Sequence, residues 1–384
     1  MKKFVWMLVV VMLFGLMGPA GAEDAVPEVR EVALDLMGSS IRYPQLTGLA
    51  DADVQQAVND AVMQAGQIEA RLNRAAALIS APVKLNVSYE CTWFDPAGVF
   101  SCAILADGAV TNNRATQEWA GVNIDLRTGE EITLEQLFTD ADEARAALET
   151  LLEEQVAPEM SAHLAAGSLA PLPDTFTISP QGITFRYPIK QFRTLADRAG
   201  TVTVLWSEIR EYLRLEEGDV LYGAALHLTL DETSRERIAA AIADGSLDGI
   251  PAAVGEGMQG LIDRYALLND PDIYEGGRMI ALEDGAFRKV WLLTDGLTEE
   301  FENSVVQAIR ADRLCLHGLM TGVTTMEAWR AALGGPEYTV TVDGAQAESW
   351  CIVPGTSDYY TMGEYRLRLH ADESGVLTSV FLMQ

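Results

Sequence analysis

The strand-forming segments of this chain follow one another in runs, and a few helical segments separate the runs. The clearest helix begins at Asp51, after which apolar residues recur every three or four positions until Pro82 ends the pattern. Strand patterns then occupy residues 87–125 and 176–206, and four strands run from residue 337 to the end. Helices and strands that are clustered in this way predict an α+β fold, with antiparallel sheets packed against amphipathic helices.

The length of 384 residues predicts two to three domains. A glycine at position 167 suits the end of a second long helix, and a stretch rich in glycine and small residues at 244–257 suits a domain boundary. We therefore expect an N-terminal α+β domain at residues 23–167 and a smaller α+β domain packed on it at 168–250. A C-terminal α+β domain with an antiparallel sheet is expected at 251–384.

The first residues have the pattern of a signal peptide. Lys2 and Lys3 precede an apolar run at residues 4–17, and Ala20 and Ala22 form the small-x-small pattern of a cleavage site. The apolar run is shorter than the ~20 residues that span a bilayer. We expect cleavage after Ala22, although an uncleaved anchor stays an alternative. The mature protein is thus predicted to be secreted or extracytoplasmic, in the cell envelope, with membrane contact only through the transient signal peptide.

Four cysteines in an exported chain favour disulfide bonds, and sequence alone allows three pairings. The segment Asp95-Pro96-Ala97-Gly98 suits a type I turn between two strands. If Asp95 lies opposite Gly98, counting back four residues on each strand places Cys91 opposite Cys102, where cross-strand Cβ atoms have the separation of a disulfide. By elimination, Cys315 would pair with Cys351.

The sequence contains no known catalytic motif, and it indicates no metal or cofactor site. It contains no G-x-S-x-G, H-E-x-x-H, P-loop or dinucleotide-binding pattern. The cysteines do not form C-x-x-C pairs and the four histidines are scattered, which disfavours zinc.

The net charge of −29 argues against a nucleic-acid partner, because affinity for phosphate depends on Lys and Arg. It would steer cationic partners toward the protein. The alternative is that the acidity only keeps an exported protein soluble.

Aromatic residues are spread through the strand segments, where core packing is their usual role. Tyr359 and Tyr360 differ, because neighbours on a strand point to opposite faces and cannot both enter one core. We therefore select Asp358, Tyr359 and Tyr360 as candidate binding residues, since exposed aromatics often recognise carbohydrate or protein.

Several motifs resemble exported bacterial proteins with the paired domains of unknown function numbered 4163 and 3298 (DUF4163 and DUF3298). The motifs are YPQL at 43–46, NIDLRTGEEITL at 123–134, FTISPQGITFRYP at 176–188, and the segments 202–204 and 207–209. Members include the lysozyme-binding ectodomain of an anti-sigma factor and modules attached to polysaccharide deacetylases. This resemblance implies an envelope-facing binding or sensing module. No deacetylase domain and no cytoplasmic segment are evident, so neither deacetylation nor signalling is carried over.

The C-terminal part resembles modules of bacterial lipoproteins and beta-lactamase-inhibitor-like proteins, which mostly bind proteins. The motifs are GVTTME at 322–327 and LGGP at 333–336. The leading hypothesis is a non-enzymatic envelope module that binds a cationic, lysozyme-like protein or cell-wall glycan such as peptidoglycan. The alternatives are a carboxylate-dependent cell-wall hydrolase, with two Asp or Glu about 5–10 Å apart, and a structural scaffold without a ligand.

Overall fold

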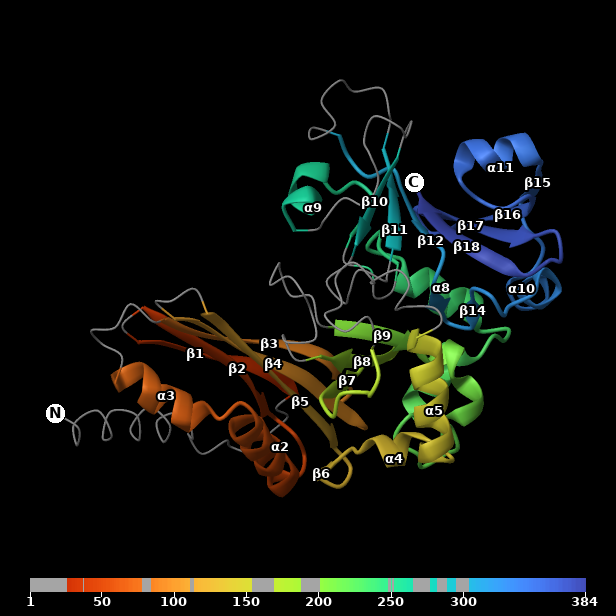
Figure 1. Ribbon diagram of the computed structural model, residues 1–384. Helices are drawn as coiled ribbons and strands as arrows, with labels where there is room; N and C mark the ends of the chain where they lie inside the picture. The colour runs from red at the N-terminus through yellow and green to blue at the C-terminus, as the bar shows by residue number, and fades with distance from the viewer. Residues whose placement is uncertain are drawn as a thin grey trace.

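The computed structural model describes residues 26–36, 38–77, 84–110, 114–153, 169–187, 201–247, 250, 252–264, 277–281, 289–294 and 304–384. Within these ranges the chain is α+β, as predicted, and three sheets of three or more strands succeed one another along it with their helices (Figure 1). No helix in these ranges is long and apolar enough to cross a bilayer. The predicted signal peptide at 1–22 lies outside them.

The N-terminal sheet has six strands in sequential order. They are β1 (Glu28–Leu36), β2 (Ser39–Thr47), β3 (Lys84–Phe94), β4 (Val99–Val110), β5 (Arg114–Asp125) and β6 (Glu130–Glu131). Helices α2 (Ala52–Ala65) and α3 (Ile68–Ala77) connect β2 to β3 and cover one face of the sheet (Figure 1). This crossover makes β2 and β3 parallel, whereas the other neighbours in the sheet are antiparallel.

The single helix predicted from Asp51 to Pro82 is two helices. Asp51 caps the first, since its side chain accepts hydrogen bonds from the backbone N–H groups of Asp53 and Val54. The break falls at Gly66 and Gln67, and Gln67 adopts a left-handed backbone with φ of 47°. The helical spacing of apolar residues continues across this turn, so periodicity alone did not reveal it. The predicted end at Pro82 lies outside the described residues.

The hairpin of β3 and β4 places Cys91 opposite Cys102, as predicted, although its turn and its strand register differ from the prediction. Asp95 pairs with Val99 through two backbone hydrogen bonds of 2.8 and 3.0 Å, so the turn is one residue longer than expected. A bulge between Cys91 and Trp93 adds one residue to β3 and restores the register. The bulged residue, Thr92, donates a hydrogen bond to the carbonyl oxygen of Ile178 in the next sheet.

The middle sheet consists of β7 (Phe176–Ile178), β8 (Gly182–Arg186) and β9 (Thr201–Leu205). Its helical elements are α4 (Leu134–Leu137), α5 (Ala141–Leu151), η3 (Trp206–Glu208), η4 (Arg210–Tyr212) and α7 (Tyr222–Leu228). Strand β7 crosses the N-terminal sheet at Gly121, where a Cβ atom would lie 2.1 Å from the carbonyl oxygen of Phe176. Ser101 and Asn123 complete this junction, because both bond to the backbone of β7.

The C-terminal sheet has seven antiparallel strands in the order β10-β11-β12-β18-β17-β16-β15. Its strands are β10 (Gly277–Ala281), β11 (Lys289–Leu293), β12 (Ala308–Ala311), β15 (Tyr338–Val342), β16 (Gly355–Met362), β17 (Tyr365–Asp372) and β18 (Leu377–Met383). The pair β13 (Cys315–Leu316) and β14 (Leu319–Met320) forms a separate ribbon. The helices are α8 (Ser234–Ala241), α9 (Met258–Arg264), α10 (Met326–Leu333) and α11 (Gly344–Trp350).

Three hydrophobic cores correspond to the three sheets. The first lies between residues 41 and 126, the second mainly between 93 and 228, and the third between 238 and 382. The second core also contains Cys315 and Met320, so the β13–β14 ribbon packs on the middle part of the chain. Shared packing does not define units that fold independently, and the domain limits at 23–167, 168–250 and 251–384 stay predictions.

Candidate binding face of the C-terminal sheet

The two faces of the C-terminal sheet differ in composition. Alternate residues of β17 show this, because Leu367, Leu369 and Ala371 enter the third core together with side chains of α8, α9 and α10. The intervening residues, Arg366, Arg368 and His370, lie on the opposite face. That face is partly covered by α11, whose Trp350 ring lies over the Arg368 guanidinium at 4.7 Å. We call it the outer face.

Six residues of the outer face lie directly opposite one another on six neighbouring strands and form an aromatic–arginine row. In order across the sheet they are Trp291, Arg310, Phe381, Arg368, Tyr359 and Tyr338. Each guanidinium lies over the rings beside it, with distances from the arginine Cζ to the ring centroids of 4.4 to 5.8 Å. Such contacts contribute about 0.5–2 kcal/mol each, so the row ties the strands together.

Every side-chain nitrogen of Arg310 has a hydrogen-bond partner. Its Nε and Nη2 atoms donate to the two carboxylate oxygens of Asp312 at 2.7 and 2.6 Å. Nη1 donates to the carbonyl oxygen of Trp350, and Nη2 also donates to that of Cys351. These carbonyls belong to the C-terminal end of α11, so Arg310 fixes the helix on the outer face.

Arg368 is buried to a similar degree, with 7% of its surface exposed, but it lacks such partners. Nε donates to Ser357 Oγ at 3.0 Å, while Nη2 is buried without a hydrogen-bond partner among the described residues. No described carboxylate lies within ion-pair distance of it. Burial lowers the pKa of the Arg368 guanidinium below its usual value, and the charge of Arg310 acts in the same direction.

A chain of hydrogen bonds orients Arg368. Ser357 Oγ accepts from Arg368 Nε and lies 2.9 Å from Nδ1 of His370, whose Nε2 lies 2.8 Å from the carbonyl oxygen of Val353. Because a carbonyl only accepts, Nε2 carries the proton, and Ser357 then donates to Nδ1. Burial lowers the pKa of His370, which favours this neutral form.

The open end of the outer face is apolar and exposed. Tyr338, Trp350 and Val353 have exposed fractions of 42%, 39% and 44%. The ring of Tyr338 stacks on that of Tyr359 with centroids 4.3 Å apart, and the Arg366 guanidinium lies 6.0 Å from the Tyr338 centroid. These residues, Tyr338, Trp350, Val353, Tyr359, Arg366 and Arg368, are called the binding face below.

The three binding residues selected from sequence have different positions. Tyr359 belongs to the binding face, whereas Tyr360 is 1% exposed and packs in the third core, which agrees with the argument that adjacent tyrosines point to opposite faces. Asp358 is fully buried and pairs with Arg330 through two hydrogen bonds of 2.7 Å. It also accepts from Trp329 Nε1 at 3.0 Å, so it anchors α10 on the core side.

The residues of the binding face that sequence reasoning missed are Tyr338, Trp350, Val353, Arg366 and Arg368. One signal could have found the two arginines, because Arg366 to His370 alternate between basic and apolar side chains in a strand. Such a strand places its basic side chains on a single face.

The cysteine predictions have different outcomes. Cys91, which is exposed, and Cys102, which is buried, are direct cross-strand partners, and both thiols are free in the structure. Cys315 is buried and donates its thiol hydrogen to the carbonyl oxygen of His227 at 3.3 Å, whereas Cys351 is exposed at the end of α11. The structure therefore places Cys91 and Cys102 opposite each other, as predicted. Both disulfide bonds stay predictions.

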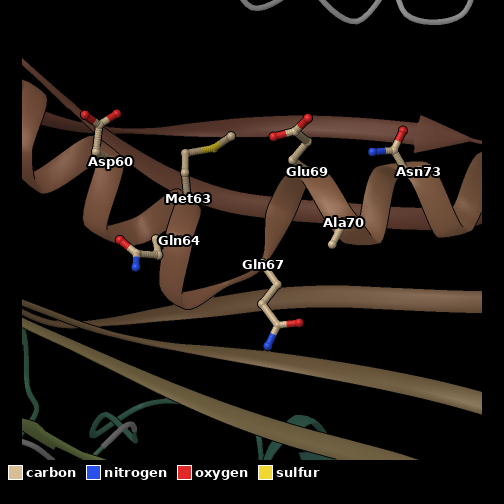
Figure 2. A pocket seen from close by; sticks show the side chains of 7 residues that line it. All are labelled: Asp60, Met63, Gln64, Gln67, Glu69, Ala70 and Asn73. Carbon is tan, nitrogen blue, oxygen red and sulfur yellow. The ribbon is translucent and has the colours of Figure 1, made fainter.

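A groove lies along helices α2 and α3. It has a volume of about 510 Å³ and is lined by Asp60, Met63, Gln64, Gln67, Glu69, Ala70 and Asn73. Figure 2 shows Asp60 and Glu69 on either side of Met63. Both acidic residues are exposed to solvent, whereas a carboxyl that acts as a general acid usually needs a buried, apolar environment. The groove therefore provides less specific chemistry than the binding face.

No family model matches the chain, and no curated protein matches it. Among solved structures, it is similar to a DUF3298 family member from Bacteroides fragilis, with 15% identity and a TM-score of 0.38 over 50% of this chain and 94% of that chain. A DUF3298 protein from Pseudomonas aeruginosa gives 9% identity and a TM-score of 0.36 over 50% and 96%.

A DUF4309 protein from Bacillus subtilis gives 13% identity and a TM-score of 0.25 over 40% of this chain and 97% of that chain. The first two structures carry the name of one of the two families that the sequence motifs resemble. DUF4163 and the lipoprotein modules have no counterpart among these three.

Proposed function

We propose that the protein is an exported, non-enzymatic module of the cell envelope that binds cell-wall glycan through the binding face. The observation that carries this proposal is the stack of the exposed Tyr338 ring on the half-buried Tyr359 ring, beside Arg366 and Arg368. Aromatic rings bind the apolar faces of sugars, and arginines bind acidic groups. Cell-wall glycans combine both features.

The rigidity of the binding face suits recognition. Tyr359 projects from β16, which lies next to the outermost strand, and Arg368 projects from β17, nearer the middle of the sheet. Arg310 fixes α11 beside them. Side chains held by strands and by supporting hydrogen bonds lose little conformational entropy when a ligand binds.

The experiment is co-sedimentation of the full mature chain with insoluble purified peptidoglycan, with cellulose as an uncharged control. We expect saturable binding to peptidoglycan, weaker retention on cellulose, and no release of reducing sugar. Equal retention on both polymers, or none on either, would contradict glycan recognition. Release of reducing sugar would favour the alternative of a carboxylate-dependent hydrolase.

A cationic, lysozyme-like protein is the second candidate partner, and the net charge of −29 favours it. Such binding would use acidic surface rather than the binding face, whose charged groups are arginines. Titration with lysozyme at low and raised salt tests it, because exposed charge pairs are screened by salt. Binding that resists raised salt would argue against an electrostatic origin.

A further inference from the structure

The unbalanced charge of Arg368 is the feature that the fold itself does not explain. Among the described residues, two other arginines are buried to a similar extent, namely Arg186 and Arg310. Arg186 pairs with Glu90 at 3.1 Å and Arg310 pairs with Asp312 at 2.6 Å. Arg368 has neither a described carboxylate within ion-pair distance nor a partner for Nη2. A buried cation without a counter-charge destabilises the folded protein, and a bound anionic ligand would supply the missing charge.

The surroundings of Arg368 determine which of its atoms can meet a ligand. The Phe381, Trp350 and Tyr359 rings lie 4.4, 4.7 and 5.7 Å from its Cζ atom. The three rings pack around the guanidinium, and Ser357 Oγ accepts from Nε. Nη2 is a buried donor that has no hydrogen-bond partner among the described residues, so it can donate to an acceptor on a ligand.

A second unsatisfied donor lies on the same strand and the same face. Arg366 Nε, two residues from Arg368, is buried without a hydrogen-bond partner in the part of the chain that the structure describes. Two such donors call for a ligand group with two acceptor oxygens and a negative charge. A carboxylate matches this requirement, since its two oxygens can accept from two guanidinium groups.

We propose that the binding face takes a glycan that carries carboxylate groups, and that one carboxylate binds to Arg368 and Arg366. This inference rests on the proposed glycan-binding function. The sugar stacks beside Tyr338 and Tyr359, which are adjacent to the two arginines on the sheet. The ring of Trp350 moves aside on binding, because it is the most exposed of the three rings that cover Arg368.

The test compares three soluble probes against the full mature chain by calorimetry. The probes are a peptidoglycan fragment with free carboxylates, the same fragment with its carboxylates amidated, and an uncharged N-acetylglucosamine oligomer. We expect the free-carboxylate fragment to bind about tenfold or more tightly than its amidated form, as a lost charge-assisted pair predicts. In R368Q this preference should disappear while the affinity for the amidated fragment stays within about twofold.

R210Q, which removes an exposed arginine from η4, is the matched control and should keep the preference. The wild-type comparison is independent of whether R368Q folds. Equal affinity of the wild-type chain for the two fragments would overturn the carboxylate assignment and leave glycan binding standing. Failure of all three probes to bind would overturn the proposed function itself. A second readout is tryptophan fluorescence, whose change on binding should be reduced in W350F.

Discussion

Tyr338 and Tyr359 stack face to face at the open end of the C-terminal sheet, with ring centroids 4.3 Å apart and an interplanar angle of 16°. Tyr338 lies on β15, an outermost strand of this sheet, and Tyr359 lies opposite it on β16. The pair therefore combines an exposed ring, which lies near Arg366, with a half-buried one, which lies near Arg368. A ligand that stacks on Tyr338 would be brought next to Arg366 and Arg368.

Replacing Tyr338 by alanine is expected to weaken retention on peptidoglycan severalfold, because it removes the exposed platform. The fold should change little, since an aromatic pair at an exposed site contributes only about 0.5–1.5 kcal/mol. Co-sedimentation and thermal unfolding measure the two effects. Y222A is the matched control, because Tyr222 is a similarly exposed tyrosine, 46%, on α7. If both variants bind like the wild type, the stack has no part in recognition.

Asp358 is expected to be a stability residue and not a ligand contact. Burial opposes its ionisation, but hydrogen bonds from Arg330, Thr339 and Trp329 outweigh this effect and lower its pKa. The D358N variant should lose about 2–4 kcal/mol of unfolding free energy, because a buried pair loses one charge. Urea unfolding measures it, and E348Q, at an exposed residue of α11, should stay within about 0.5 kcal/mol of the wild type.

The lowered pKa of Asp358 predicts how the stability that its carboxylate contributes depends on pH. Because the pKa of Asp358 is lower in the folded state, the unfolded chain takes up a proton first as the pH falls. The contribution is complete above the unfolded pKa of about 3.9 and is lost below it. The wild type and D358N should therefore converge in stability as the pH falls through this range. A constant difference would show that Asp358 acts without its charge.

His370 is expected to destabilise the fold in mild acid. Burial lowers its pKa, and the charges of Arg368 and Arg310 add to this effect, while the Val353 carbonyl and Asp312 oppose it. Since the unfolded pKa is about 6.5, the stability is complete above that value and decreases as the pH falls toward the folded pKa. Unfolding free energies at a series of pH values from 7 to 5 should fall less steeply in H370Q. Parallel slopes for the two proteins would contradict this assignment.

The sequence predicted local features of the fold better than contacts between residues that are far apart in the chain. The strand alternation that separates Tyr359 from Tyr360 was readable, because it depends only on neighbouring residues. The partners of Arg310 were not, since Trp350 and Cys351 are 40 and 41 residues away and meet it only through α11. That Arg368 Nη2 has no hydrogen-bond partner among the described residues could not be predicted either, because it depends on how distant segments pack.

The hairpin at Asp95 shows that a correct prediction can rest on errors that cancel. The turn is one residue longer than the predicted type I turn, which alone would have moved Cys91 away from Cys102. The bulge at Thr92 corrects the register, and it exists where Thr92 reaches β7. Contacts between two sheets therefore decided a detail that turn chemistry within one hairpin could not.

The final prediction is that Cys91 and Cys102 form a disulfide under oxidising conditions. They are direct partners across β3 and β4, and Cys91 is exposed to reagents. Burial raises the pKa of both thiols, so Cys102 stays protonated at neutral pH and Cys91 is the accessible thiol for attack on the oxidant. With oxidised glutathione, Cys91 first forms a mixed disulfide, and Cys102 then displaces the remaining glutathione thiol, which leaves two reduced glutathione molecules.

Peptide mapping after alkylation should then find residues 91 and 102 linked, with an unfolding free energy about 2–3 kcal/mol above that of the reduced protein. C102A is the control, because it leaves Cys91 as a mixed disulfide and should gain no such stability from the oxidant. Alkylation of both cysteines after full oxidation would contradict the pairing. Because Cys315 and Cys351 are mapped in the same experiment, it also decides whether the second predicted disulfide forms.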